Sequence, residues 1–215
     1  EIGVDGFVQD GRLVFLAPHT KFVYKGKNTT IPVGHAFPYT CSREVYDEIG
    51  RQMQAAVTAS GADRCSVNAD VFVDGNKISI IEMGGRTGAT CIPELISIYY
   101  GFDFYEKMIR SALGEQVEFN CTGRQPCMAK LLLSPIEGKI SHINIEGIRK
   151  LEEQGVTVSL DFPVGHKVFA MADGTDRIGH IIARTEDESR LDAWMMEVYR
   201  CISIDGVTLE DIWKR

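Results

Sequence analysis

Two acidic residues twelve positions apart, Asp70 and Glu82, frame the part of the sequence that most restricts the fold. Apolar and β-branched residues lie on both sides of Asp74-Gly75-Asn76, and such a turn between two apolar segments is typical of a hairpin. The pattern predicts two antiparallel strands, Val67 to Val73 and Lys77 to Met83. The chain is therefore expected to contain a sheet in which two neighbouring strands each carry an acidic residue.

The register of this hairpin decides whether the two carboxylates meet. Successive side chains of a strand point to opposite faces, so Phe72 shares a face with Asp70, and Ile78 and Ile80 share one with Glu82. If three or five residues form the turn, Asp70 lies directly opposite Glu82, and Phe72 lies against Ile80 on a buried face. We therefore expect an apolar face with two opposed carboxylates at one end.

Opposed carboxylates on neighbouring strands repel each other unless a positive charge lies between them. Mg²⁺ suits such a site, because it takes one or two protein carboxylates and fills its other positions with water and substrate phosphates. Mn²⁺ is an alternative, since it prefers similar oxygen ligands. The competing interpretation is that one acid is simply solvated beyond the sheet edge. Spacing alone leaves both interpretations open.

The composition argues against several classes of partner. The 215 residues are 44% hydrophobic and 25% charged, which is ordinary for a globular chain with a substantial core. A formal net charge of −7 argues against nucleic acid and anionic membranes as partners, because both attract positive fields. No apolar run is long enough to cross a bilayer. Six cysteines without a CxxC pair predict free thiols in the reducing cytoplasm.

Local signals predict two further elements in the first half. The segments Ile2 to Val8 and Leu13 to Leu16 predict a hairpin around Asp10-Gly11, because both turn positions tolerate the positive φ angles of a tight turn. Ser42 is a favourable N-cap and predicts a helix that runs to Ser60. Its buried stripe recurs every four positions: Val45, Ile49, Met53 and Val57.

The segment between these elements, Ala17 to Tyr39, is rich in glycine and proline and predicts an ordered loop or lid. Three of its lysines, Lys21, Lys25 and Lys27, are candidates to reach a phosphate. His35 lies in this segment, away from any apolar face, and is the candidate for substrate contact. A surface histidine or one hydrogen-bonded for structural reasons is the alternative.

The second half predicts an α+β arrangement in which antiparallel strands alternate with helices. The expected helices are a region around Leu95 to Tyr100, then Phe104 to Leu113, and a final one, Glu188 to Cys201. The expected strands are Met128 to Leu133, Gly138 to Ile143, Thr157 to Leu160, Lys167 to Ala172 and Ile178 to Ala183. We expect two domains, 1–118 with an antiparallel sheet and helices, and 119–215 as a terminal α/β subdomain.

Several segments of known type follow one another in a fixed order. Asp70 and the later Ile-Glu-Met-Gly-Gly-Arg-Thr-Gly of 81–88 are similar to a metal-binding strand pair of the form E/D, hairpin, E-x-N-x-R. The segment 33–38 is similar to a Gly-His-x-x-Pro loop, and 1–7 looks like a strand that follows an adenine-binding hinge. Three segments are similar to a terminal region: 134–140, 165–168 and 176–180. Taken in their order along the chain, the segments resemble the C-terminal portion of the ATP-grasp carboxylate-amine ligases and of biotin carboxylase.

The resemblance implies an ATP- and Mg²⁺-dependent ligase that activates a small carboxylate as an acyl phosphate for attack by an amine. It implies that Asp70 and Glu82 hold Mg²⁺ at the β- and γ-phosphates. Arg86 would stabilise the phosphorylated substrate, and Lys21 would contact a phosphate. Gly84 departs from the pattern, because the family usually places a ligating asparagine there. The second metal position is therefore in doubt.

Further cofactor contacts follow from the same resemblance. The backbone amides of Gly85 and Gly88 would hold phosphate oxygens, and His35 would lie at the cofactor. The alternative is that both glycines serve only to let the backbone of the loop turn. The chemistry needs these groups because a carboxylate that attacks ATP brings one anion against another.

Two other functions remain open. The first is activation of bicarbonate, as in biotin carboxylase and carbamoyl phosphate synthase; Thr87, Gly88, Ala89 and Thr90 weaken it, because those enzymes carry an acid and a histidine after the arginine. The second is a folded module without activity of its own. The chain begins at Glu1 inside an apparent strand, which we interpret as a cut within a domain. A homodimer is compatible with the sequence.

Overall fold

The computed structural model describes residues 1–25 and 30–214, so Lys27 of the predicted lid lies outside the described residues. Contacts divide the chain into two compact units. The first contains Glu1–Lys21 and His35–Pro126, and the second contains the described residues within 22–34 and 127–215. Antiparallel strands and helices occur in both units, which confirms the α+β class. The functional division at residue 118 stays a prediction.

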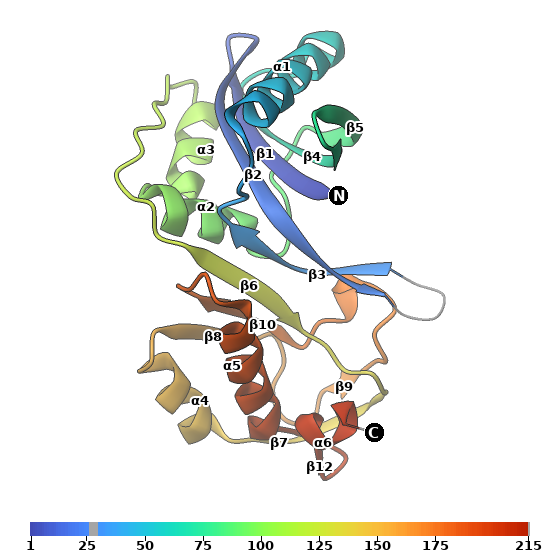
Figure 1. Ribbon diagram of the computed structural model, residues 1–215. Coiled ribbons are helices and arrows are strands. Elements are labelled where there is room, and N and C mark those ends of the chain that lie inside the picture. The colour runs from blue at the N-terminus through green and yellow to red at the C-terminus, as the bar shows by residue number, and fades with distance from the viewer. Residues whose placement is uncertain (26–29, 215) are drawn as a thin grey trace. The chain divides into compact units, whose positions relative to one another are not determined.

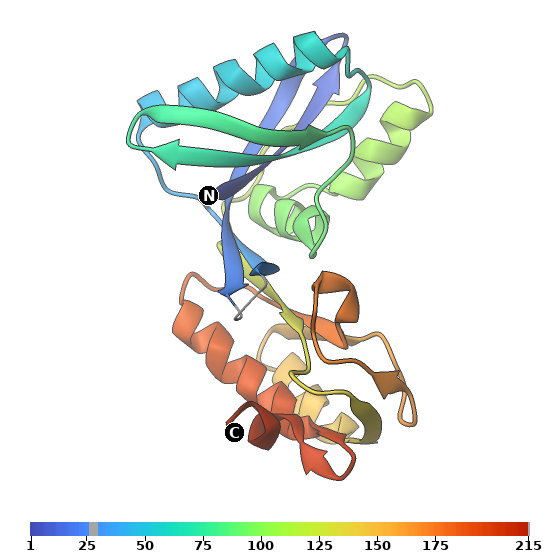
Figure 2. The same ribbon diagram turned by 90° about the vertical axis from the view of Figure 1, so that its right-hand side faces the viewer.

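Four antiparallel strands in the order β5-β4-β1-β2 form the sheet of the first unit (Figure 1). Helix α1 lies along one face of this sheet, and α2 and α3 lie along the other (Figure 2). The strands are β1 (Ile2–Gln9), β2 (Arg12–Lys25), β3 (Thr30–Phe37), β4 (Cys65–Asp74) and β5 (Lys77–Gly84), and β2 and β3 have residues in both units. The helices are α1 (Arg43–Ser60), α2 (Ile92–Tyr100) and α3 (Phe104–Ala112).

Helix α1 forms as the sequence predicts. The Ser42 side chain accepts a hydrogen bond from the Val45 N–H and caps the first turn, and Gly61 ends the helix in the left-handed conformation with φ 70°. All four residues of the predicted stripe are buried: Val45, Ile49, Met53 and Val57. They pack on aliphatic side chains of β1, β4 and β5. Each such side chain contributes roughly 1.5–3 kcal/mol by leaving water.

The predicted loop over 17–39 is wrong, because β2 and β3 occupy most of it. Strand β2 pairs with β1 from Gln9↔Arg12 to Ile2↔Thr20. This ladder supplies the backbone with hydrogen bonds, and Pro18 removes only one donor from it. The Asp10-Gly11 turn, by contrast, is confirmed, with φ angles of 54° and 70°.

The β4–β5 hairpin has a tighter turn than expected. Asp74 pairs with Lys77 across two residues, which suits the twist of the strands better than a longer loop. Phe72 consequently pairs with Ser79 and is 52% exposed. The predicted contact of Phe72 with Ile80 on a buried face is therefore wrong.

The second unit contains a part of β3 together with β6, β10 and β8, and a separate sheet in the order β12-β11-β7-β9. Its strands are β6 (Cys127–Leu132), β7 (Gly138–Ile143), β8 (Val156–Leu160), β9 (Lys167–Val168), β10 (Gly179–Ala183), β11 (Ile202–Ile204) and β12 (Val207–Thr208). Its helices are α4 (Ile145–Glu152), α5 (Glu188–Cys201) and α6 (Leu209–Trp213), with a short 3₁₀ turn at Gly174–Asp176. Within 1–25 and 30–214, no helix is long and apolar enough to cross a membrane.

Three details of the second unit correct the prediction. Helix α5 has the predicted bounds, but β11, β12 and α6 follow it, so it is not the final helix. The strand predicted over 167–172 ends at Val168, because the Ala172 N–H donates to the Asp176 carboxylate instead of to a neighbouring strand. Helix α4 was not expected; the Asn144 side chain caps it by accepting from the Gly147 N–H.

Candidate metal centre

The register of the first sheet aligns four residues in one row across its strands. Glu82 of β5 pairs with Asp70 of β4, Asp70 pairs with Gly3 of β1, and Gly3 pairs with His19 of β2. Directly paired residues of antiparallel strands point to the same face. This face is opposite the one that α1 covers, because the neighbouring positions on each strand pack against that helix. The predicted pairing of Asp70 with Glu82 is confirmed.

Two β-bulges produce this row. In the β1–β2 pair, Phe7↔Phe15 is followed by Val8↔Leu13, so Val14 is the additional residue. In the β4–β5 pair, Asp70↔Glu82 is followed by Val71↔Ile80, so Ile81 is the additional residue. Both additional residues are exposed, Val14 at 41% and Ile81 at 58%.

The bulge at Ile81 reverses the face of the acidic residue that follows it. Without it, Glu82 would share the α1 face with Ile78 and Ile80, as the period-two pattern predicted. With it, Glu82 turns to the face of Asp70 and is exposed. Bulges at the edge of a sheet commonly re-aim one side chain in this way. The pairing of Asp70 with Glu82 was thus predicted correctly. The predicted register of the hairpin and the predicted face of Glu82 were both wrong.

A lysine already lies beside one of the carboxylates. The Lys21 Nζ donates to Asp70 Oδ2 at 2.9 Å and to Glu1 Oε1 at 2.5 Å, and its side chain is 9% exposed. Burial alone would lower the pKa of Lys21, but the hydrogen bonds to Glu1 and Asp70 outweigh burial and raise the pKa above its usual value. Lys21 is therefore an ammonium at neutral pH. Its position shows that this face holds a positive charge.

The loop after β5 carries the remaining predicted residues. Glu82 forms no ion pair with any described residue. Arg86 is exposed, and its Nη1 donates to the Thr87 carbonyl at 2.8 Å, which leaves its other N–H groups toward solvent. Gly85 is exposed, and a Cβ placed there would meet no atom within 4 Å. Gly84 lies two residues after Glu82 and therefore on the same face.

Asp5 is a buried residue of this site that the sequence analysis missed. It is 0% exposed, and its Oδ2 accepts from Asn68 Nδ2 at 2.8 Å and lies 3.1 Å from His19 Nε2. Its Oδ1 accepts from the Gly88 N–H at 2.8 Å, and Thr87 Oγ1 lies 3.5 Å away. The carboxylate thus connects three strands to the loop that bears Arg86.

Gly88 therefore anchors the loop. Its N–H already donates to Asp5, and a Cβ at this position would lie 2.4 Å from Ile92 Cδ1 and 2.8 Å from Asn68 Nδ2. Only glycine allows so close an approach. Gly3 has a similar role, because a Cβ there would lie 2.0 Å from His19 Cε1. The His19 ring lies over Gly3 and reaches Asp5.

His35 lies on β3 and not in a loop. It is 6% exposed, its ring is perpendicular to that of His19 at a centroid distance of 4.7 Å, and it is not a surface residue. Burial, and after it the nearby His19 and Lys21, hold the pKa of His35 well below its usual value, although a backbone hydrogen bond with Thr20 opposes them. His35 is therefore a neutral ring at neutral pH.

The side chains present fit a magnesium ion. Two carboxylates project from neighbouring strands on one exposed face, and Mg²⁺ needs no more than one or two when phosphates complete its shell. Among the described residues no group of three or more His, Cys, Asp or Glu side chains is arranged around one point. Gly84 adds no oxygen, but a Cβ there would meet Arg86 Cγ only at an ordinary 3.6 Å.

Comparison with known proteins places the fold. No protein-family profile and no curated protein matches the sequence. Phosphoribosylglycinamide synthetase from Anaerococcus prevotii is similar in structure, with a TM-score of 0.79 and 24% identity over 94% of this chain and 52% of that chain. L-amino acid ligase from Bacillus licheniformis follows with a TM-score of 0.76 and 16% identity, over 94% and 53%.

A third similar structure is the biotin carboxylase domain of 2-oxoglutarate carboxylase from Hydrogenobacter thermophilus, in complex with MgADP and bicarbonate. Its TM-score is 0.67 and its identity 15%, over 100% of this chain and 49% of that chain. This chain has the ATP-grasp fold. It matches the C-terminal region of these enzymes and spans about half the length of each. The resemblance seen in the sequence is confirmed at the level of the fold.

Proposed function

We propose that this chain supplies the metal and phosphate end of an ATP-dependent ligase that couples a carboxylate to an amine. The observation that carries the proposal is the pairing of Asp70 with Glu82 on an exposed face, with the Lys21 ammonium on Asp70. The ATP-grasp fold supports it, since a similar carboxylase domain binds MgADP.

In this proposal Asp70 and Glu82 hold Mg²⁺. The ion, when bound, neutralises the β- and γ-phosphates so that an anionic nucleophile can approach. Lys21 stays protonated and brings a second positive charge to the phosphates. To bind a phosphate oxygen, it gives up one of its two carboxylate partners. Glu1 and Asp70 share this one lysine, and Glu82 has no ion pair with any described residue. The excess of negative charge favours a divalent cation over further lysines.

Arg86 is the residue that we place at the reacting carboxylate. Its guanidinium is exposed and has N–H groups free of acidic partners among the described residues, so it can hold the acyl phosphate with two hydrogen bonds. The exposed amide of Gly85 would add a third donor. Gly88 contributes through Asp5, which holds the loop in place. His35 packs against His19 as a neutral ring.

The reaction balances without a covalent enzyme intermediate. A carboxylate oxygen attacks the γ-phosphorus, ADP leaves, and an acyl phosphate forms. The amine nitrogen then attacks the carbonyl carbon, and the C–O bond breaks. Inorganic phosphate therefore leaves with one oxygen of the original carboxylate.

An ¹⁸O experiment tests this sequence in a ligase that contains the chain. After a screen of carboxylic acids and amines for phosphate release, the active acid is supplied with ¹⁸O in its carboxylate. We expect ADP and ¹⁸O-labelled phosphate, and we expect Glu82→Gln to abolish both while Asp74→Asn, on the same hairpin, keeps them.

Other products would identify the alternatives. Label in AMP would show an adenylating ligase and would refute the proposal. ADP release that requires bicarbonate and ignores the amine would point to carboxylase-type activation. No ATP turnover with any acid would leave the folded, inactive module as the function of this chain.

A further inference from the structure

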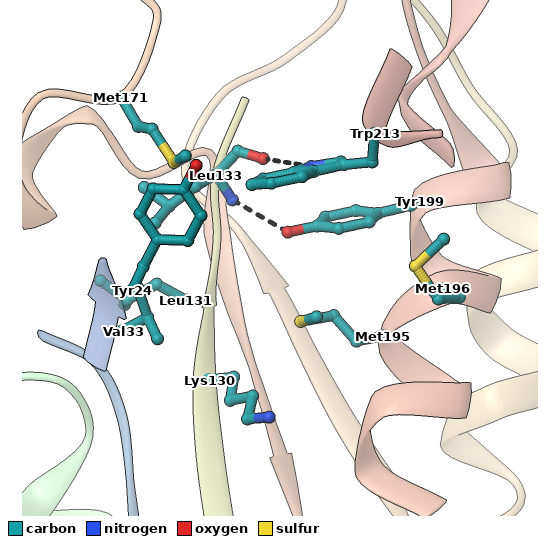
Figure 3. Close-up of a pocket in the computed structure, with 10 residues that line it drawn as sticks. All are labelled: Tyr24, Val33, Lys130, Leu131, Leu133, Met171, Met195, Met196, Tyr199 and Trp213. Carbon is teal, nitrogen blue, oxygen red and sulfur yellow. Dashed lines mark hydrogen bonds between the residues drawn. The ribbon is translucent and has the colours of Figure 1, made fainter. Parts of the chain in front are cut away.

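The second unit contains an apolar cavity of about 320 Å³ (Figure 3). Its walls come from the ends of β2 and β3 that belong to this unit, from β6, and from α5 and α6. Three of its lining residues are almost completely buried: Leu131, Leu133 and Tyr199, at 2–3% exposure. The cavity therefore reaches the core of the unit and is not a flat face. Its volume lies at the lower end of the range of small-molecule pockets.

Two aromatic side chains form a rigid wall of this cavity. The Trp213 Nε1–H donates to the Leu133 carbonyl at 3.1 Å, and Tyr199 Oη accepts from the Leu133 N–H at 3.3 Å. The two rings are almost parallel, at 9°, with centroids 6.1 Å apart (Figure 3). Their polar atoms are thus used by the backbone, so the cavity presents mainly ring surface. A wall held in this way loses little entropy when a ligand binds.

The rest of the lining is soft and apolar. Tyr24 approaches Trp213 edge-on, at 78° and 6.1 Å. Met171 and Met195 extend toward the space between Tyr24 and the two parallel rings (Figure 3). Methionine adapts its shape to a ligand and makes favourable sulfur contacts with aromatic rings. The lining therefore suits a flat ring better than a branched aliphatic group.

Charge at the edge of the cavity disfavours anions. Among the described residues that line the cavity, Lys130 is the only cation, and its Nζ donates to Glu188 at 2.9 Å and to Asp192 at 2.5 Å. It also lies 4.7 Å from the centre of the Phe22 ring. One ammonium shared by two carboxylates leaves net negative charge there. An anionic ligand would gain no free partner and would lose its hydration.

We propose that this cavity is a binding site for a small, flat, uncharged aromatic molecule of one or two fused rings. It is separate from the residues of the proposed ATP site, all of which belong to the first unit. The ligand stacks on or against Trp213 and Tyr199 and contacts the methionine side chains. The proposal does not depend on ligase activity.

Methionine methyl groups give a direct test on the 215-residue chain. The sequence has seven methionines, of which Met171, Met195 and Met196 line the cavity. With ¹³C-methyl methionine, a titration with indole should shift these three signals through ring currents, with saturation. The signals of Met53, Met83 and Met108, in the first unit, are internal controls and should not move. Indole-3-acetate, the same ring with a negative charge, should bind at least tenfold more weakly.

A cavity-filling variant sharpens the test. Met171→Trp places a large ring in the cavity and should weaken indole binding at least tenfold, whereas the matched variant Met108→Trp should leave it unchanged. If Met171→Trp does not give a folded spectrum, Met171→Phe takes its place. The proposal fails if the three methyl signals do not saturate, if all seven shift together, or if indole-3-acetate binds as well as indole. It also fails if these signals change with protein concentration alone, because a second copy would then fill the cavity.

Discussion

The two faces of the first unit's sheet use the same strands in different ways. The face under α1 is aliphatic, and close packing holds its side chains in place: Ile49, Met53 and Val57 fill the space above β1, β4 and β5. The opposite face carries charge, and hydrogen bonds and the strand register determine where its side chains lie. Asp5, buried at 0% exposure, connects three strands to a loop there. Neighbouring positions of one strand thus contribute to an aliphatic core on one side and to a charged, hydrogen-bonded face on the other.

The difference lies in what each face leaves unsatisfied. The α1 face buries an aliphatic cluster and presents no charged side chain within it. On the opposite face the row ends in the half-buried Asp70 and the exposed Glu82. Glu82 has no ionic partner among the described residues, and Asp70 shares Lys21 with Glu1. Changes to the row should therefore alter activity and metal binding, whereas changes beneath α1 should alter stability.

The largest effect is expected for Glu82→Gln in a ligase that contains this chain. The amide keeps the shape but loses the charge that we propose holds Mg²⁺, so kcat should fall by about three orders of magnitude, roughly 4 kcal/mol. The measurement is ATP turnover, with thermal unfolding in parallel. Asp74→Asn, an exposed acid at the turn of the same hairpin, should retain full activity.

Met53→Ala is the converse control for that variant. It should lower the free energy of unfolding by about 2–5 kcal/mol and leave turnover of the folded protein unchanged. Retention of more than about a tenth of kcat by Glu82→Gln, less than roughly 1.4 kcal/mol, would rule out a metal-ligand role.

Asp5→Ala should have the next largest effect. It leaves the buried Gly88 N–H and the half-buried Asn68 amide without this acceptor, which costs about 3 kcal/mol of stability. Hydrogen exchange of the Gly88 amide should become faster at the same time. Asp5→Asn keeps one oxygen and should lose less. Unchanged exchange at Gly88 in Asp5→Ala would show that the carboxylate does not hold the loop.

The pH dependence of stability should report His35. Its pKa in the folded protein is below the usual value, so the unfolded chain binds the proton first as the pH falls. The His35 contribution is complete above pH 6.5 and is lost as the pH falls toward the folded-state pKa, with a limiting slope of about 1.4 kcal/mol per pH unit. Denaturant unfolding between pH 7.5 and 5.5 measures it. His35→Gln should reduce the slope; an equal slope in the variant would contradict the assignment.

The smallest effect is expected for Gly84→Asn. Gly84 has the same face as Glu82, and the new Cβ meets only Arg86 at ordinary distance, so the fold should tolerate it. In the proposed metal site the added amide oxygen would be a further ligand. A titration with Mn²⁺ by electron paramagnetic resonance should show severalfold tighter binding, less than about 1.4 kcal/mol. Weaker binding would show that position 84 does not face the ion.

The α1 face could be predicted from the sequence almost completely. The cap at Ser42, the four-residue stripe and the stop at Gly61 are local signals, and local signals fix a helix. The Asp10-Gly11 turn was found for the same reason. The presence of Pro18 led to the wrong prediction for β2. The stabilisation that β2 gains by pairing with β1 cannot be read from the composition of 17–39.

The row was predicted only in part, because its geometry depends on two bulges. A period-two pattern assumes an uninterrupted ladder, and neither Val14 nor Ile81 differs from an ordinary strand residue in the sequence. Asp5 was missed because its partners lie on other strands and in the loop of 84–88. The available signal was an acidic residue within an apolar strand, which requires a buried partner. Which partner it finds is decided only by the register.

Localised binding of Mn²⁺, in place of Mg²⁺, to the ¹⁵N-labelled chain tests the central claim most directly. We expect the ion to broaden the amide signals around Asp70 and Glu82 first, with a dissociation constant on the order of 1 mM in the absence of nucleotide. Glu82→Gln should weaken this broadening at least tenfold, and Asp74→Asn should not change it. Broadening centred elsewhere, or unchanged in Glu82→Gln, would show that the row across β5, β4, β1 and β2 is not a metal site.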